Sequence, residues 1–125
     1  MLMIETPFRM RRLGESTVLF YEPDGGKIAI GFLLNDLIGE AWSVKADTLA
    51  IPVSCLNPTF FDLSTGIAQA VVRPLVNYRI TIAFFGRIPP EYLEDAALRD
   101  FIRDTNRGRS AWFLDDLAAL EKRLS

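Results

Sequence analysis

The 125-residue chain contains no histidine and only one cysteine. Without imidazole it cannot form a Ser-His-Asp or Cys-His triad, and it lacks the ligand found in most zinc sites. A single thiol excludes an internal disulfide and a cysteine-only metal site, and it is typical of proteins in a reducing compartment. No helix N-terminus or neighbouring cation is predicted to activate Cys55, so we expect an inert, buried thiol. The sequence therefore predicts no catalytic residue, no metal and no cofactor.

Long apolar runs and a strong net charge are also missing. The longest apolar runs, near residues 28–34 and 67–72, fall far short of the roughly 20 residues that span a bilayer. The N-terminal residues show no basic start followed by an apolar core, so no signal peptide is predicted. A net charge of −2 produces no strong field toward nucleic acid or anionic lipid. We expect a cytoplasmic protein that has neither a membrane nor a nucleic-acid partner.

The length and composition predict a single domain spanning residues 1–125. Two smaller pieces would have poor cores, whereas half of the residues are hydrophobic and nine are Phe, enough for one packed interior. Apolar periodicity divides this domain into strand-like and helix-like segments. The predicted strands are 8–13, 17–21, 47–53, 78–85 and 110–114, and the predicted helices are 32–45, 62–77, 91–105 and a C-terminal helix capped by Asp115 with Leu117, Leu120 and Leu124 facing inward.

The order of these segments predicts an α/β fold. The short link Gly14-Glu15 makes the first two strands an antiparallel hairpin. Strands that then alternate with helices imply right-handed crossovers and parallel pairing. We therefore predict a mixed sheet of four to five strands, with the N-terminal hairpin followed by parallel β-α-β-α-β-α units. Arg9 and Arg11 mark the first strand as an edge strand protected by charge.

The segment from Asn57 to Gly86 organises this prediction. The β-branched and aromatic run Ile80–Phe85 is typical of an interior strand that is covered on both faces. Pro74 should bend or end the helix before it, because proline removes a backbone donor. In the earlier helix, Gly39 costs about 1 kcal/mol relative to alanine, and we expect close packing on the sheet to compensate.

One polar cluster has plausible chemistry: Asp62, Ser64, Thr65 and Gly66. Short polar side chains at a helix start usually cap free amides, which contributes about 1 kcal/mol. The functional alternatives are an anion or phosphate site at the positive end of the helix and a phosphorylation switch. We predict that the two hydroxyls are exposed in the first turn of this helix, at the carboxyl end of the preceding strand. These four residues are the binding or phosphorylation candidates.

Four blocks of sequence resemble a known family. They read DLIGEAW (36–42), FFDLSTGIA (60–68), VNYRITIA (76–83) and LRDFIRDTNRG (98–108). From about Gly14 to its C-terminus the chain resembles a small bacterial family labelled only as domain of unknown function 4180. That resemblance implies no activity.

The element order more distantly resembles the STAS domain (sulfate transporter and anti-sigma factor antagonist). In that fold a strand leads into a loop reading Asp-Ser-Ser/Thr-Gly at a helix start, and the hydroxyl residue can be phosphorylated to switch partner binding. The matching loop here, Asp62–Gly66, is one residue longer. The resemblance implies a non-enzymatic regulatory or protein-interaction module that binds a protein partner or a second copy of itself. The alternative is a small-ligand-binding domain or enzyme that uses the crevice at the carboxyl ends of the parallel strands.

Overall fold

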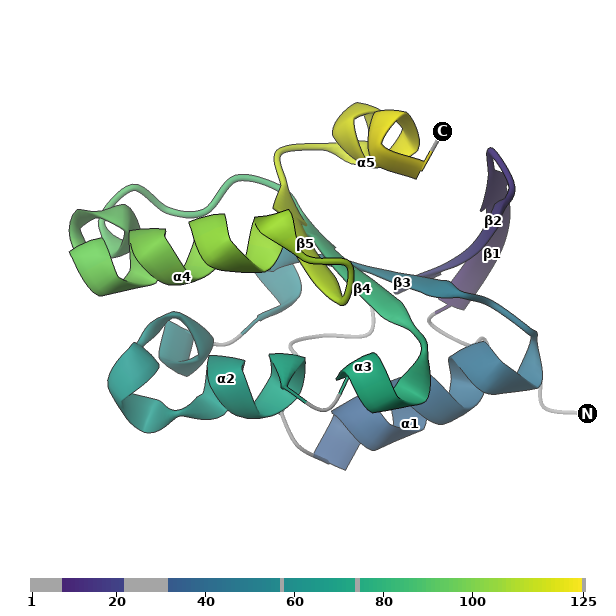
Figure 1. The fold of residues 1–125 in the computed structure, drawn as a ribbon, viewed down its shortest axis with the longest axis horizontal. Coiled ribbons are helices and arrows are strands. Elements are labelled where there is room, and N and C mark those ends of the chain that lie inside the picture. Colours follow the sequence, from purple (N-terminus) through teal and green to yellow (C-terminus); the bar gives the residue numbers. More distant parts are fainter. Residues whose placement is uncertain (1–7, 22–31, 57, 74, 125) are drawn as a thin grey trace, which may run out of the picture.

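A five-stranded mixed sheet forms the centre of the computed structural model, which describes residues 8–21, 32–56, 58–73 and 75–124 (Figure 1). The strand order is β1-β2-β3-β4-β5; β1 runs antiparallel to β2, and all other neighbours are parallel. The predicted α/β class and hairpin are therefore confirmed, and β1 is an edge strand as expected. The strands are β1 (Phe8–Leu13), β2 (Ser16–Tyr21), β3 (Thr48–Pro52), β4 (Thr81–Phe85) and β5 (Ala111–Leu114).

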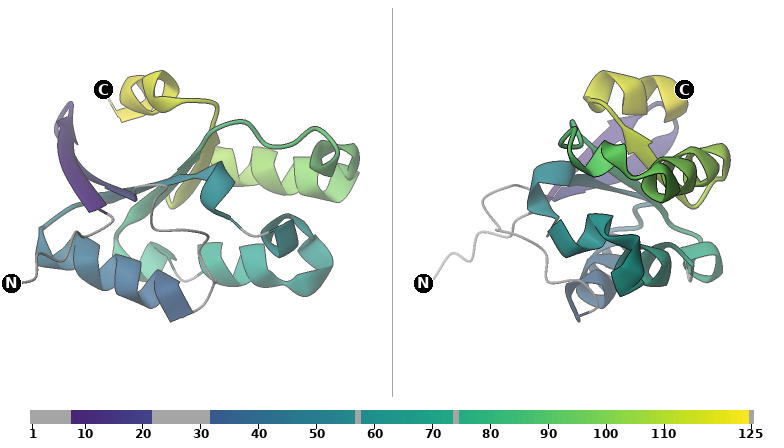
Figure 2. Two further views of the ribbon diagram at one scale, coloured as in Figure 1. Left: turned by 180° about the vertical axis from the view of Figure 1, so that it is seen from behind. Right: turned by 90° about the vertical axis from the view of Figure 1, so that its left-hand side faces the viewer.

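Helices cover both faces of the sheet. In Figures 1 and 2, α1, α2 and α3 lie on one side of the sheet and α5 lies on the other. Leu98 of α4 belongs to the same apolar cluster as residues of α1, α2 and α3, which places α4 on their side. The α-helices are α1 (Phe32–Ser43), α2 (Ile67–Val72), α3 (Leu75–Tyr78), α4 (Ala96–Arg107) and α5 (Leu117–Leu124), and short 3-10 helices span η2 (Val53–Cys55), η3 (Pro58–Phe61), η4 (Leu63–Thr65) and η5 (Tyr92–Glu94).

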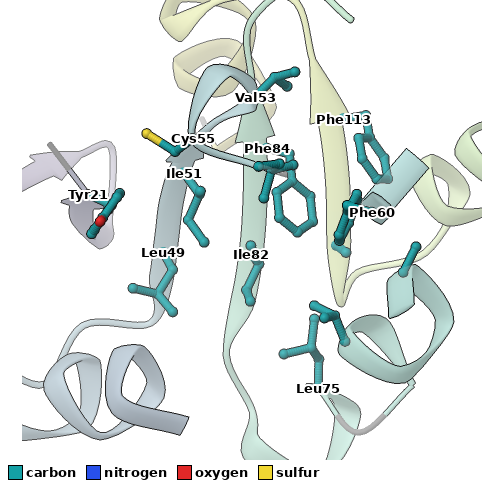
Figure 3. Packing of buried hydrophobic residues seen from close by; sticks show 14 of the residues in the cluster. Tyr21, Leu49, Ile51, Val53, Cys55, Phe60, Leu75, Ile82, Phe84 and Phe113 are labelled. Carbon is teal, nitrogen blue, oxygen red and sulfur yellow. The ribbon is translucent and has the colours of Figure 1, made fainter. Parts of the chain in front are cut away.

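Strand β4 is an interior strand with both faces buried, as its sequence predicts. Ile82 and Phe84 point into the larger cluster, and Ala83 points into the smaller cluster beneath α5. Alternating side chains of a strand face opposite sides of the sheet, so one strand supplies both cores. On the larger side the ring centroids of Phe84 lie 5.2 Å from Phe60 and 5.0 Å from Phe113 (Figure 3). The middle strand of the five is nevertheless β3 rather than β4.

The single helix predicted over residues 62–77 is wrong, because three short helices occupy this stretch. Gly66 has a left-handed backbone (φ 74°) that separates η4 from α2, and glycine adopts this conformation at little cost. Helix α2 ends at Val72 and α3 begins at Leu75, so an interruption occurs where one was expected; Pro74 itself lies outside the described residues. Tyr78 belongs to α3, and β4 therefore begins three residues later than predicted.

The starts of the last two helices also differ from the prediction. Helix α4 begins at Ala96 because the carboxylate of Asp95 caps it. The cap of α5 is Asp116 rather than Asp115. Leu117, expected to face inward, is 38% exposed. In both helices the position of one hydrogen-bonding carboxylate decides the boundary, and a periodic apolar pattern does not specify it.

The prediction that Gly39 packs closely against the sheet is wrong. The residue is exposed. Apart from its chain neighbours and the adjacent backbone of α1, no heavy atom of the described residues lies within 4 Å of the place that a Cβ would occupy. Its φ is not positive. Nothing in the described part of the chain therefore requires glycine here.

We expect Gly39→Ala to raise the free energy of unfolding by about 0.5–1 kcal/mol, because alanine loses less backbone entropy in a helix interior. Urea unfolding followed by circular dichroism measures this change. The exposed Ala118 of α5 offers the reverse control. Ala118→Gly should lower the free energy of unfolding, by less than Gly39→Ala raises it, because Ala118 lies in the first turn of its helix. A loss of stability in Gly39→Ala would contradict the open environment.

Candidate functional site

A cleft of about 700 Å³ opens at the carboxyl ends of the parallel strands. Tyr21, Pro52 and Phe85, the last residues of β2, β3 and β4, lie on its wall. Open α/β sheets usually bind ligands at this edge, and the volume is within the range of small-molecule sites, about 300–1,000 Å³. We refer to it as the carboxyl-end cleft. Its described lining consists of Arg9, Arg11, Phe20, Tyr21, Pro52, Val53, Ser54, Leu56, Pro58, Phe61, Phe85, Gly86, Arg87, Pro89, Tyr92 and Leu117.

Aromatic side chains line this cleft on two sides of its wall that come from different elements. Phe61 comes from η3 and Tyr92 from η5, and their rings stack with centroids 5.2 Å apart and planes 12° apart. Tyr92 is positioned by the turn at the two prolines, where its N–H donates to the carbonyl of Pro89 (3.0 Å). On the sheet side, the rings of Phe20 and Phe85 meet edge to face at 6.3 Å. The two pairs form apolar walls on elements that are distant in sequence.

Three arginines add positive charge to these walls. Arg9 and Arg11 share one face of β1 because alternate residues of a strand point to the same side, and Arg87 follows the end of β4. The guanidinium of Arg11 lies 5.8 Å from the ring centroid of Phe20, a cation–π contact. No Asp or Glu is among the described residues that line the cleft. The arrangement suits a ligand that combines an apolar body with a negative group.

Cys55 and Tyr21 lie side by side next to the cleft, from η2 and β2 (Figure 3). The thiol is 3% exposed, and burial raises the pKa of Cys55 above its usual range despite the opposing hydrogen bond with Ser54. Burial, and then the proximity of Cys55, also raise the pKa of Tyr21. The predicted burial of Cys55 is therefore confirmed. A buried thiol that keeps its proton is a poor nucleophile.

The predicted polar cluster forms a compact turn that is held by its own hydrogen bonds. The hydroxyl of Ser64 donates to Oδ1 of Asp62 (2.6 Å), and the N–H of Ser64 donates to the same oxygen (3.1 Å). Oγ1 of Thr65 lies 2.8 Å from the carbonyl oxygen of Asp62 and 3.0 Å from that of Thr59. The N–H of Ile67 donates to Thr65 Oγ1 (3.2 Å). These contacts are the capping arrangement, with Asp62 as the N-cap of η4.

The position of this turn corrects the prediction in one respect. Ser64 and Thr65 lie in η4, before the left-handed Gly66, and not in the first turn of α2. Two short helices, η2 and η3, separate the turn from the end of β3 in the sequence. Asp62, Ser64, Thr65 and Gly66 are all exposed. The fold therefore brings the four candidates together at the surface.

Two further features of the described residues bear on function. No helix among them combines the length and apolarity needed to cross a membrane. No three His, Cys, Asp or Glu side chains in the described ranges are placed to hold a metal ion.

Comparison with known proteins gives one match. The family model described as Domain of unknown function (DUF4180) matches residues 14–124, which is most of the chain. The chain belongs to this family. No curated protein and no solved structure matches it. The family description assigns no activity, so inferences about the function of this DUF4180 chain rest on the geometry above.

We expect the buried thiol to make the stability of this DUF4180 chain depend on pH. A thiol titrates near pH 8.5 in an unfolded chain, whereas the pKa of Cys55 is raised in the native state. Below that unfolded pKa both states are protonated and the contribution of Cys55 is fully present. As the pH rises toward the native pKa, only the unfolded state loses its proton, and the free energy of unfolding falls by up to about 1.4 kcal/mol per pH unit.

Urea unfolding between about pH 7 and pH 9.5, below the range in which Tyr21 contributes, measures this slope. Cys55→Ala should flatten it, whatever the variant's absolute stability. An unchanged slope in Cys55→Ala would show that the thiol titrates normally in the native state.

Proposed function

We propose that this domain is a cytoplasmic, non-enzymatic regulatory module that binds a small amphipathic anion in the carboxyl-end cleft. The observation that carries the proposal is the meeting of aromatic walls and three arginines, with no carboxylate among the described lining residues. The ligand has an aromatic or aliphatic body and a carboxylate, sulfonate or phosphate group. This is the small-ligand alternative that the strand order suggests, combined with a regulatory role.

The contacts define two parts of the proposed ligand. Its apolar body lies against the stacked rings of Phe61 and Tyr92, which already form a flat surface. Its anionic group meets Arg87 or the arginines of β1, whose planar forks bind carboxylate and phosphate oxygens in pairs. Specific small-molecule sites commonly have this composition, a largely apolar wall with a few polar groups.

The side chains around the cleft favour binding over catalysis. The chain has no histidine, and the raised pKa of Cys55 keeps its thiol protonated at neutral pH. The titratable side chains that line the described cleft are those of arginine and tyrosine, and no carboxylate or imidazole is among them. A general base would have to come from the ligand or from water.

The test uses 8-anilinonaphthalene-1-sulfonate, a fluorescent probe with an apolar body and one sulfonate. We expect saturable binding to the native protein and displacement by phenylacetate. Arg87→Gln should weaken probe binding about tenfold, as for loss of one charge-assisted hydrogen bond. Arg73→Gln, which removes the same charge from an exposed position outside the cleft, should leave it unchanged.

Equal weakening by Arg87→Gln and Arg73→Gln would overturn the proposed site. The proposed site would also be overturned if the probe fluoresces only under conditions in which near-UV circular dichroism shows that tertiary packing is lost. The probe also binds partly unfolded states.

A second candidate function is a phosphorylation switch at Ser64 or Thr65, supported by the exposure of both residues and by the resemblance to STAS domains. Thr65 Oγ1 contacts the carbonyl of Thr59 in η3, and η3 also supplies Pro58 and Phe61 to the cleft. A phosphoryl group on Thr65 would displace that contact and add about −1.5 to −2 charges near Asp62. Modification would thereby alter both the exposed turn and the cleft wall, and so binding of a protein partner or a second copy.

Incubation with serine/threonine kinases from the same genome, followed by intact-mass measurement, tests the switch. We expect the mass of one phosphoryl group, lost in Ser64→Ala or in Thr65→Ala, and retained in Ser43→Ala, which removes an exposed hydroxyl elsewhere. If no kinase adds mass, or if both turn variants are still modified, these residues serve only to cap the turn.

A further inference from the structure

The opposite edge of the sheet has a second hollow of about 500 Å³, at the amino ends of β3 and β4. We call it the amino-end hollow. Four arginines from four separate segments line it. Arg79 follows α3, Arg107 ends α4, Arg109 precedes β5 and Arg123 belongs to the last turn of α5.

The charges around this hollow are unbalanced. The one carboxylate in its described lining is Asp47, and that group already accepts hydrogen bonds from the N–H of Thr17 (3.4 Å) and the hydroxyl of Thr48 (2.8 Å). The side chains of Arg79, Arg107 and Arg109 form no ion pair, hydrogen bond or ring contact with other residues in the described ranges. A local excess of positive charge thus occurs in a chain whose net charge is −2.

Helix dipoles explain only part of this cluster. Arginine in the last turn of a helix complements the negative helix end, which accounts for Arg107 and Arg123. It does not account for Arg109, which lies outside the helices. Arg79 has φ 55°, a conformation that glycine or asparagine usually adopts. An arginine therefore occupies a backbone conformation that glycine or asparagine would adopt with less strain.

One of the four guanidinium groups is already held in place. Arg123 donates to the carbonyls of Asn106 and Gly108, the latter at 3.5 Å. Its guanidinium carbon also lies 4.6 Å from the ring centroid of Trp112. A fixed, planar fork loses little freedom when it accepts a ligand, which favours binding of phosphoryl oxygens.

We propose that the amino-end hollow binds a small molecule through a diphosphate group. Two linked phosphoryl groups carry about −3 charges, which matches the net charge of the four arginines and Asp47. A guanidinium group can bind phosphoryl oxygens in pairs, and the four arginines come to the hollow from four separate segments. The site lies at the other edge of the sheet from the carboxyl-end cleft and is independent of the function proposed for that cleft.

Isothermal titration calorimetry of the full chain with inorganic pyrophosphate tests the site. We expect saturable binding that is at least about tenfold tighter than for orthophosphate or sulfate at equal ionic strength, because a second phosphoryl group adds charge-assisted hydrogen bonds. Equal affinity for pyrophosphate and ADP would support recognition of the diphosphate alone; tighter ADP binding would support a nucleoside diphosphate. No saturation with either, or equal affinity for sulfate, would overturn the proposal.

Variants separate the site from general charge effects and from unfolding. Arg79→Gly and Arg109→Gln should each weaken pyrophosphate binding about tenfold or more. Arg79→Gly should melt at or above the wild-type temperature, because glycine accepts the positive φ. Arg73→Gln removes the same charge from an exposed position outside both hollows and should not change binding. If Arg73→Gln weakens pyrophosphate binding as much as Arg109→Gln does, the amino-end hollow is not the site.

Discussion

The burial of β4 on both faces is the constraint on which the rest of the structure depends. Ile82 and Phe84 require cover on one face and Ala83 on the other, so helices must pack on both sides of the sheet. With both faces occupied, the two ends of the parallel strands remain for binding. Both hollows lie there, the carboxyl-end cleft at one edge and the amino-end hollow at the other.

Much of this fold could be predicted because its signals are local. The apolar run ending at Phe85 identifies an interior strand, and strand–helix alternation gives the parallel order. The errors occur where one backbone or capping detail outweighs periodicity. The left-handed Gly66 divides an apparently continuous helix, and the carboxylate of Asp95 delays the start of α4. Gly39 was expected to pack against the sheet, but a glycine in a helical pattern does not reveal which neighbours it has.

The candidate sites divide in the same way. The Asp62–Gly66 turn could be found from the sequence because its hydrogen bonds join residues at most six positions apart. The arginines of the two hollows could not, because chain crossovers bring together residues such as Arg11 and Arg87. The excess of arginine over lysine, eleven to three, was the one indication of anion binding in the composition. Such an excess does not show which arginine side chains come together in the fold. Tertiary placement, more than residue type, makes these sites.

Helix α5 contributes to both hollows. Leu117 at its start lines the carboxyl-end cleft, and Arg123 near its end lines the amino-end hollow. Its eight residues span about 12 Å, so the two hollows share a single short element as part of their walls. Leu120, between those two residues, is its fully buried anchor. A tilt of α5 about Leu120 would therefore displace the walls of both hollows together, because each wall includes one end of the same helix.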